Sequence, residues 1–485
     1  MMQDTASPPD DSTATASLLR QLAEELGAAS VLTGDAIAGP YVEDWSRDRT
    51  GRCLAVLRPD SVQAVSRICQ LCARAGVGVI PQGGHTGLVG GAQRETADCV
   101  VVSTARLKAI RGIDPDNMTA TVEAGVVLQN LQVALAGHGL EFPVSIGSQG
   151  SAQIGGLVST NAGGVQVVRH GMTGAHVQGL EMVLADGRVI SSISGLHKDN
   201  RGPDPLRIAI GGEGAFGIMT AACLRLTPSH GTTATAYVGC DGFDAALALF
   251  RHVRGAVYEC LTGFEVMSAA CLPLARLVDP NLTPPFEAAV HVLIRLSTVT
   301  RLPLTEMLEN LLAEAMEKGL AQDAVLAQSD RQAARFWALR EGIVEGHSKR
   351  GYHVRSDVSV RLGDVPRLVA ALEAMLAQHY PGWISQAYGH MGDGNIHFNA
   401  LPPDGMAQDL ARETGAGIEA RIFDITLSLS GSFSAEHGIG RTKAGWFART
   451  SAPDRLDLLR RIKTAFDPDW RMNPGCLLTG PEDAA

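Results

Sequence analysis

Apolar and polar positions in the first hundred residues switch between a helical and a strand-like period. The stretch Ser17–Leu26 has apolar residues at helical spacing and predicts a short amphipathic helix with Ser17 as its cap. Cys53–Asp60 predicts a buried strand, after which Ser61 can cap a second helix that ends at Gly76. The string VGVIPQGG follows as another strand and enters a glycine-rich loop. This strand–helix–strand order favours an α/β lobe.

From about Asp98 to Pro228 the pattern changes to short apolar runs separated by Gly, Asn and Asp. Runs such as CVVVS, TATVEAG, LEMVLADG, RVISS and CLRLTP predict a second, largely antiparallel sheet. Within it, LADGRVI predicts a hairpin with Asp186–Gly187 in the turn.

After Pro228, strand-like runs alternate with long helical runs rich in Ala and Leu. The expected strands are ATAYVG, AAVHVLIRL, DVSVRL, WISQAYGH and NIHFNAL. The expected helices include FDAALALFRHV, LTEMLENLLAEAMEKG, VPRLVAALEAMLAQ and MAQDLARETGAGIEARIFDITLSL. This order predicts an α+β lobe in which helices cover a sheet, and the last stretch predicts one more helix followed by a Pro- and Gly-rich tail.

Composition and charge limit the partners that the chain can have. With 485 residues, the chain should form two or three domains. The net charge of −10 argues against a nucleic-acid partner, and no apolar run is long enough to span a bilayer. The nine scattered cysteines favour free thiols in a reducing cytoplasm. Residues 1–15 are polar and acidic, lack the features of a signal peptide and are expected to be disordered.

Two glycine-rich stretches point to a cofactor. Pro81–Ala92 contains five glycines in twelve residues directly after a predicted strand, and Gly147–Gly164 repeats the theme with Ser and Asn side chains. Glycines let backbone N–H groups come close to a phosphate, although a tight surface turn would use them as well. Two such stretches in one lobe predict an extended dinucleotide such as FAD.

Two other motifs carry weaker signals. Gly212, Gly214 and Gly217 form a GxGxxG, but a predicted strand follows them, and the nicotinamide fingerprint requires a helix there. Cys69 and Cys72 form a CxxC inside a predicted amphipathic helix, where a packed helix face is favoured over a metal or redox site.

Two strings near the C-terminus supply the residues of a metal site. YGHMGDGNIHFN places His390 and His397 on either side of a predicted strand–turn–strand, and SAEHGIG supplies Glu436 and His437. Two histidines and a carboxylate make a common open site for zinc or a similar divalent ion, and His437 could then serve as a base. Structural histidines in a strand are the alternative, and Glu436 must come from elsewhere in the fold.

Two arginines are candidates for binding a carboxylate. Arg340 lies in a predicted helix, and Arg355 lies in a predicted strand with Arg361. Arginines can bind carboxylates through two parallel hydrogen bonds, although exposed, solvated arginines would show the same pattern.

These motifs together resemble the flavoproteins of the vanillyl-alcohol-oxidase superfamily, in particular the D-2-hydroxyacid dehydrogenases of the D-2-hydroxyglutarate dehydrogenase and D-lactate dehydrogenase/glycolate oxidase type. The resemblance runs from about Asp44 to Leu478 and rests on PQGGHTGLVGG, IGGLVSTNAGG, RHGMTGAHVQGLEMVLADG, GGEGAFGI, WALREG, GHMGDGNIH and SAEHGIG. It implies an α+β fold with a two-subdomain FAD-binding lobe of the PCMH type and an α+β cap domain with an antiparallel sheet. The expected ranges are 16–229 for the FAD-binding lobe, 230–440 for the cap and 441–485 for a segment that returns to the FAD lobe.

The resemblance also implies roles for individual residues. His390, His397 and Glu436 match the metal ligands, with zinc as the expected ion, and His437 matches the catalytic base. Substrate-binding roles are implied for Asn399, Arg340, Val344 and Arg355, with Asn399 also supporting catalysis. The residues expected to contact FAD are Pro81, Gln82, Gly83, Gly84, His85, Thr86, Gly87, Ser151, Ile154, Gly155, Gly156, Asn161, Gly164, Gly217, Ile218 and Asn473.

The chain departs from the resembling enzymes at three positions. The hydroxyglutarate enzymes usually carry Asn where this chain has His85, and other branches bind flavin covalently through a histidine in this loop. His85 could therefore form a covalent bond or a hydrogen bond to the cofactor. Val344 stands where those enzymes have Thr, and Arg355 stands where they have Lys. Two cations are retained, so a dicarboxylate stays plausible while its identity is open.

The expected activity is oxidation of a D-2-hydroxyacid, D-2-hydroxyglutarate first, by hydride transfer to flavin N5. The metal would bind the substrate oxygens, and the electrons would pass to an external acceptor such as electron-transfer flavoprotein or a quinone. The alternatives are a D-lactate, glycolate or D-malate dehydrogenase, an oxygen-using oxidase, and a non-catalytic flavin-binding subunit of an electron-transfer complex. A homodimer is possible.

Overall fold

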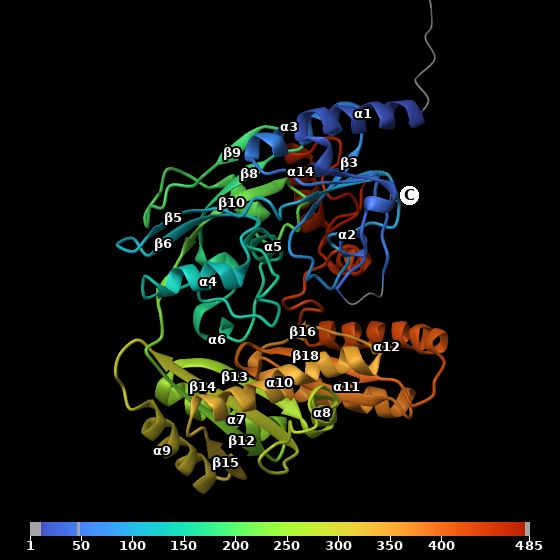
Figure 1. Cartoon of the computed structure of the whole chain (residues 1–485). Coiled ribbons are helices and arrows are strands. Elements are labelled where there is room, and N and C mark those ends of the chain that lie inside the picture. Colours follow the sequence, from blue (N-terminus) through green and yellow to red (C-terminus); the bar gives the residue numbers. More distant parts are fainter. Residues whose placement is uncertain (1–10, 46–48, 481–485) are drawn as a thin grey trace, which may run out of the picture.

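The first lobe opens on a small sheet that is parallel apart from one edge strand (Figure 1). The computed structural model describes residues 11–45 and 49–480. As predicted, the Ser61 hydroxyl caps the helix after β2 by accepting from the Ala64 N–H, and the helix ends at a left-handed Gly76. The strand order is β1 (Val31–Leu32), β2 (Ala55–Leu57), β4 (Cys99–Ser103), β3 (Gly78–Gln82), and the helices are α1 (Asp11–Leu26), α2 (Gly39–Val42) and α3 (Val62–Ala75).

Two expectations for this lobe are wrong. The run CVVVS forms β4 of this sheet, parallel to β2 and β3, instead of joining the antiparallel sheet. All five of its residues are buried, as expected for an interior parallel strand that is covered on both faces. The first helix begins at Asp11, so residues 11–15 are helical and Ser17 is not its cap. Residues 1–10 lie outside the described residues.

The second sheet is antiparallel throughout, as predicted. The strands at residues 177–183 and 189–191 form the expected hairpin, in which the Leu184 N–H bonds the Arg188 carbonyl and Gly187 has a φ of 86°. The order is β5 (Ile110–Asp114), β6 (Thr119–Glu123), β10 (Ile218–Arg225), β8 (Val177–Val183), β9 (Val189–Ser191). Packed with it are α4 (Leu128–Ala136), α5 (Ile154–Thr160) and the small pair β7 (Leu140–Glu141) and β11 (Thr227–Pro228). The short helix α6 (Val167–His170) instead contacts β13 (Leu261–Ser268) of the second lobe.

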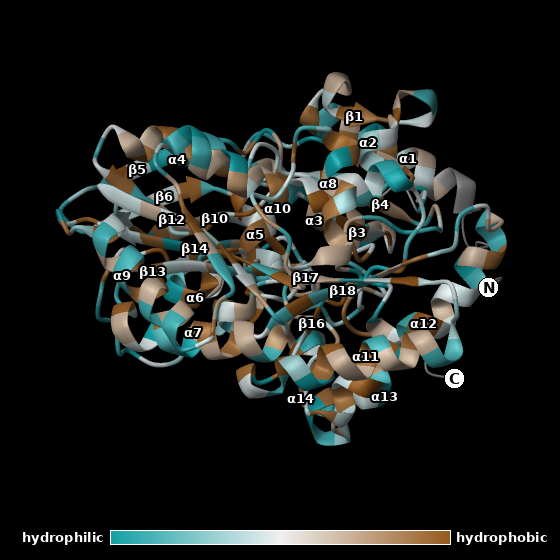
Figure 2. Cartoon of the chain, turned by 90° about the horizontal axis from the view of Figure 1, so that it is seen from below, coloured by the Kyte–Doolittle hydropathy of each residue, from teal (hydrophilic) through white to brown (hydrophobic). Residues whose placement is uncertain are grey.

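The second lobe is one antiparallel sheet with helices on both faces. One face packs against α7, α9, α11 and α12, and the other packs against α8 and α10. Figure 2 shows teal, hydrophilic colour on the outer helices such as α7 and α9. The strand order is β15 (Asp323–Leu326), β12 (Thr232–Cys240), β14 (Val290–Thr298), β13 (Leu261–Ser268), β17 (Ile384–Gly389), β18 (Asn395–Leu401), β16 (Val358–Ser359). The helices are α7 (Phe243–Val257), α8 (Leu272–Val278), α9 (Leu304–Glu317), α10 (Asp330–Arg350), α11 (Val365–His379) and α12 (Gln408–Ser428).

Arg355 does not lie in a strand, which corrects the prediction for this segment. The predicted strand DVSVRL is reduced to the two residues of β16, and Arg355 sits in an extended stretch between β16 and an isolated bridge that joins Val354 to Ala400. The pairs Val354–Ala400 and Val358–Ile396 place Arg355 and Asp357 alongside β18.

The chain end lies against the first lobe. After α13 (Ala444–Thr450) and α14 (Pro453–Phe466), Met472 pairs in parallel with Val79 of β3 and packs in the core of the first sheet. In Figure 1, the red C-terminal segment that carries α14 accordingly lies in the same lobe as α3 and β3. Within residues 11–45 and 49–480, no helix has the length and apolar character needed to cross a membrane.

Candidate active site

The hairpin of β17 and β18 brings the two predicted metal-binding histidines together. The strands are antiparallel, with Tyr388 opposite His397, and the helical turn η7 (Met391–Asp393) connects them. The rings of His390 and His397 have centroids 5.4 Å apart. The strand–turn–strand expected from the sequence is therefore confirmed.

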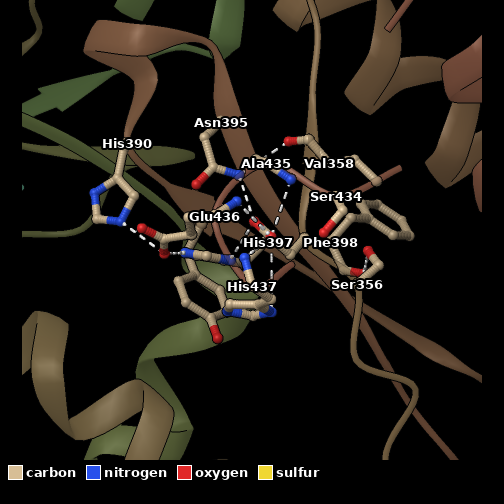
Figure 3. Close-up of polar contacts among 12 residues, drawn as sticks. Ser356, Val358, His390, Asn395, His397, Phe398, Ser434, Ala435, Glu436 and His437 are labelled. Atoms are coloured by element: carbon tan, nitrogen blue, oxygen red, sulfur yellow. Dashed lines mark hydrogen bonds and ion pairs between the residues drawn. The ribbon is translucent and has the colours of Figure 1, made fainter. Parts of the chain in front are cut away.

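Glu436 comes from a distant loop and lies between these histidines, as Figure 3 shows. Its Oε1 atom is 3.5 Å from His390 Nε2 and 3.6 Å from His397 Nε2. Ligand atoms at about 2.1 Å from a tetrahedral metal lie roughly 3.4 Å from one another. Both distances from Glu436 therefore match the separation expected between two ligands of one divalent metal.

The ionisation of His397 and Glu436 suits metal binding. Burial lowers the pKa of His397 to about 3, which keeps its imidazole neutral. Burial would raise the pKa of Glu436, but the neighbouring His390 and His397 hold it at about 2. A metal requires a neutral imidazole and a charged carboxylate as ligands, and His397 and Glu436 are already in those forms.

Asp357 is a member of the site that the sequence did not reveal. Its Oδ2 accepts the backbone N–H groups of Ala435, Glu436 and His437 at 3.0, 2.9 and 2.8 Å, and its Oδ1 accepts Asn395 Nδ2 at 2.8 Å. Asp357, His397, Glu436 and His437 each offer a ligand atom within 4.8 Å of the others. Because both Asp357 oxygens already accept hydrogen bonds, we interpret Asp357 as the anchor of the loop rather than as a ligand.

His437 stands beside the candidate metal-binding group of His390, His397 and Glu436 and contacts Asp357. Its Nδ1 lies 3.7 Å from Asp357 Oδ2, and its ring stacks on His397 with centroids 5.6 Å apart. Burial would raise the pKa of Asp357, but His437, His397 and the backbone N–H groups lower it, so the carboxylate is charged. A charged carboxylate on the Nδ1 side leaves His437 Nε2 as the atom that can accept a proton.

Glu265 on β13 is the second residue that the sequence did not reveal. It is 1% exposed, and its Oε1 lies 2.6 Å from His390 Nδ1, while its Oε2 accepts Arg340 Nε at 3.0 Å. This contact assigns the proton of His390 to Nδ1 and leaves the Nε2 lone pair for a metal. Burial would lower the pKa of His390, but Glu265 and Glu436 raise it well above its usual value in the metal-free protein.

Glu265→Gln should weaken metal binding without removing a ligand. The amide would turn an N–H group toward either His390 Nδ1–H or Arg340 Nε–H, so one of the two contacts is lost. Loss of such an outer contact typically weakens metal binding about 10–100-fold. Competition with a chelator measures the affinity, and a variant that binds metal as tightly as the wild type would contradict the role given to Glu265.

Two of the predicted substrate residues, Arg340 and Asn399, contact Tyr388, whose ring centroid lies 5.2 Å from that of His397. Arg340 is buried, with its guanidinium 4.8 Å from the centre of the Tyr388 ring. Burial raises the pKa of the Tyr388 hydroxyl to about 12, and both Arg340 and Arg355 oppose that rise. Arg355 stands between Val354, which bridges to Ala400, and Ser356, whose N–H donates to Asn399 Oδ1. Val344 lies one turn after Arg340 on α10 and is 40% exposed.

Asn399 lies in this cluster, but its amide is already hydrogen-bonded. Its Oδ1 accepts the Ser356 N–H at 3.2 Å, and its Nδ2 lies 3.3 Å from the Tyr388 hydroxyl and 3.5 Å from His347 Nε2. Burial lowers the pKa of His347 to about 3, and its Nδ1 lies 2.9 Å from the Ile343 carbonyl, so Nε2 is an acceptor. Asn399 therefore acts on the site by holding the segment that carries Asp357.

The two glycine-rich stretches lie against each other. A Cβ on Gly84 would collide with the Ser151 carbonyl, and a Cβ on Gly83 would lie 3.6 Å from Gly156. His85 has a φ of 58°, and its buried Nε2 has no hydrogen-bond partner among the described residues. Backbone packed this closely, together with an orphaned imidazole nitrogen, fits a cradle for a phosphate-bearing cofactor such as FAD.

The remaining residues expected to bind the cofactor lie around this cradle or brace it. Gln82 Nε2 donates to the Tyr41 and Ala92 carbonyls and so closes the first loop. Asn473 Nδ2 donates to the Gly91 and Glu213 carbonyls, and Asn473 Oδ1 accepts from Arg441. In the first stretch, Pro81 lies in β3, and Thr86 and Gly87 continue the loop that follows it. In the second stretch, Ile154 and Gly155 begin α5, Asn161 ends this helix with a φ of 50°, and Gly164 follows. Gly217 stands directly before Ile218, the first residue of β10.

The metal-binding group and the glycine-rich stretches meet at Gly163. A Cβ on Gly163 would lie 2.8 Å from Glu436 Oε2, so the carboxylate rests against the second stretch. The metal-binding group therefore lies directly beside the cofactor cradle.

Solved structures identify the fold as the PCMH type. A p-cresol methylhydroxylase matches with a TM-score of 0.75 at 15% identity and covers 99% of both chains. A 4-ethylphenol oxidase from Gulosibacter chungangensis matches with a TM-score of 0.74 at 17% identity and covers 100% of both chains. The FAD binding domain family matches residues 53–192, and the family of FAD linked oxidases, C-terminal domain, matches residues 229–477. The fold and these domains define an FAD-dependent oxidoreductase.

Similar sequences narrow this class to one family. The chain is 35% identical to the mitochondrial D-2-hydroxyglutarate dehydrogenase of Bos taurus, over 93% of this chain and 81% of the relative. It is 34% identical to the D-2-hydroxyglutarate dehydrogenase of Xanthomonas citri pv. viticola, over 90% of this chain and 92% of the relative. The chain belongs to the D-2-hydroxyglutarate dehydrogenase family of FAD-linked oxidases.

Proposed function

We propose that this protein oxidises a D-2-hydroxyacid, with D-2-hydroxyglutarate as the first candidate and 2-oxoglutarate as its product. The observation that carries the proposal is the convergence of His390, His397 and Glu436 beside the glycine-rich stretch at Gly163. A metal-binding group next to a flavin cradle is an arrangement suited to removing hydride from an alcohol. The names of the relatives support the same substrate.

We assign separate roles in this oxidation to the residues around the site. When bound, the metal supplies a Lewis acid that lowers the pKa of the substrate hydroxyl, and FAD supplies the hydride acceptor. His390, His397 and Glu436 would hold the metal, with zinc as the proposed ion. His437 Nε2 removes the hydroxyl proton, because its Nδ1 side faces the charged Asp357. Arg340 and Arg355 provide positive charge for the substrate carboxylate.

The loops of the first lobe would hold FAD. Residues 83–87 and 151–164 would surround the pyrophosphate and the flavin, and His85 Nε2 would contact the cofactor by a hydrogen bond. A covalent bond at His85 would leave the flavin attached after denaturation, whereas the proposed hydrogen bond releases it.

The proposal also covers the electron acceptor, the association of chains, the domain ranges and the compartment. Reduced flavin would be reoxidised by an external acceptor, either electron-transfer flavoprotein or a quinone, and two chains could associate as a homodimer. Residues 16–229 would form the FAD-binding lobe, 230–440 the cap and 441–485 the returning segment. All nine cysteines are free thiols, which suits a reducing compartment such as the cytoplasm.

Steady-state turnover with a dye as electron acceptor tests the proposed function. Protein that contains FAD and zinc should reduce one equivalent of a two-electron dye for each 2-oxoglutarate formed from D-2-hydroxyglutarate, and the L-enantiomer should be inert. Turnover of D-lactate alone would move the protein to the monocarboxylate enzymes.

Arg355→Met should change substrate preference more than it changes chemistry. Methionine keeps much of the length of the side chain but removes the cation that faces a second carboxylate. Loss of a charge-assisted hydrogen bond of about 1.5–3 kcal/mol predicts a roughly 10–150-fold fall in kcat/KM for D-2-hydroxyglutarate. The value for D-lactate should change little, and equal losses on both acids would contradict a distal-carboxylate role.

A further inference from the structure

The loop of Glu436 and His437 is held from both lobes by buried carboxylates. From the cap side, Asp357 binds the N–H groups of Ala435, Glu436 and His437. From the first lobe, Glu213 binds the next part of the loop. Its Oε1 accepts the Ile439 N–H at 2.8 Å, and its Oε2 accepts the Gly440 N–H at 2.7 Å. These N–H groups follow His437 by only two and three residues.

The backbone of Glu213 adopts a strained conformation, which a glycine at this position would adopt without strain. Its φ is 49°, a left-handed conformation in which glycine would be unstrained, and the neighbouring Gly211 and Gly214 have φ values of 71° and 76°. The chain thus keeps a glutamate at a position suited to glycine. The glutamate is 8% exposed, and its contacts with Ile439 and Gly440 are made by the side-chain carboxylate, which a glycine lacks.

The surroundings of Glu213 connect the cofactor side to the metal side. Its N–H bonds the Ser159 carbonyl in α5, and its carbonyl accepts Asn473 Nδ2 at 2.6 Å. Burial raises the pKa of Glu213, and the N–H groups of Ile439 and Gly440 oppose that rise. The backbone of Glu213 is therefore fixed beside the second glycine-rich stretch, while its carboxylate binds the loop that carries His437, the proposed base.

We propose that Glu213 is a positioning residue: it fixes the segment 434–440 against the flavin-binding lobe and thereby sets where Glu436 and His437 stand relative to the cofactor. The expected effect of Glu213 on metal binding rests on the proposed metal centre. The expected effect of Glu213 on the mobility of the loop is independent of that centre. Glu213 does not need to touch substrate or cofactor.

Glu213→Gly separates this role from a role in folding. Glycine removes the acceptor of the Ile439 and Gly440 N–H groups, which costs stability, but it also relieves the left-handed backbone, which offsets part of that cost. Met118→Gly is the matched control, because Met118 also has a left-handed φ of 48° in the same lobe but lies in the turn between β5 and β6, where its backbone bonds Pro115 and Leu226. Glu213→Gln is a second variant that keeps the size of the side chain but turns an N–H group toward Ile439 or Gly440.

Hydrogen–deuterium exchange and cobalt binding give two readouts on the FAD-loaded protein. In Glu213→Gly and Glu213→Gln, amides of peptides covering 434–442 should exchange at least tenfold faster. Co²⁺ added to metal-free protein should bind about 10–100-fold more weakly, with a changed visible spectrum, while flavin absorbance stays as in the wild type. Met118→Gly should match the wild type in both.

Three results would overturn the proposal. Unchanged exchange over 434–442 would show that Glu213 does not hold the loop. Faster exchange with unchanged Co²⁺ affinity and spectrum would show that it does not position the metal-binding residues. Loss of flavin together with metal would make Glu213 a support of the cofactor cradle instead. Failure of the wild type to bind Co²⁺ would count against the proposed metal centre, while the exchange result would still decide whether Glu213 holds the loop.

Discussion

His437→Ala is expected to slow reduction of the flavin by D-2-hydroxyglutarate about 10²- to 10⁴-fold, the usual contribution of a general base. FAD and metal should remain bound, because His437 lies beside the metal-binding group and its loop is held through backbone N–H groups. Anaerobic stopped-flow mixing measures the rate from the loss of flavin absorbance.

His252→Ala provides the control for this substitution. His252 has a similar side-chain exposure, 15% against 20% for His437, and lies on α7 near the Leu311 carbonyl. It should reduce flavin at the wild-type rate. A His437→Ala variant that also reduces at the wild-type rate, with both cofactors present, would remove His437 from the role of base.

Glu436→Gln should cause the largest loss of metal. Glu436 is the only one of the three proposed ligands that carries a negative charge, and its Oε1 lies between both histidines. An amide oxygen is a weaker ligand, so metal affinity should fall by more than the roughly 10–100-fold typical of outer contacts. Activity should fall with metal content and recover partly in excess zinc, as elemental analysis and turnover would show.

Glu181→Gln is the matched control for Glu436→Gln. Its side chain is 16% exposed, compared with 19% for Glu436, and it pairs with Arg111 in the first lobe. Its metal content should be unchanged. Full metal content and full activity in Glu436→Gln would exclude Glu436 as a ligand.

The sequence predicted the parts of the site that depend on local order. His390 and His397 flank a short turn, and a two-strand hairpin then has to bring their rings together. The caps at Ser61 and Gly76 were predictable for the same reason, since each acts on its own helix.

The anchoring carboxylates could not be predicted from spacing. Asp357, Glu265 and Glu213 act on partners 79, 125 and 226 residues away, at Glu436, His390 and Ile439 respectively. An isolated acidic residue in a strand or loop carries no local pattern, and only the folded chain shows which N–H groups it meets. For Glu213, the sequence does contain one local signal, a glutamate within the glycine-rich string GGEGAFG.

Burial explains the errors in the strand predictions. The run CVVVS lacks the alternation of a half-exposed strand because both faces of β4 are covered. Arg355 lies in a stretch of β-like composition, but tertiary contacts leave only Val358 and Ser359 in a strand.

The most direct test is to mix protein containing FAD and zinc anaerobically with D-2-hydroxyglutarate, D-malate and D-lactate, and to follow the visible absorbance of the flavin. The proposed function predicts rapid bleaching by D-2-hydroxyglutarate or D-malate, slow bleaching by D-lactate, and no rapid phase after the metal is removed. If none of the three acids bleaches the flavin while both cofactors are bound, the assignment as a D-2-hydroxyacid dehydrogenase is contradicted.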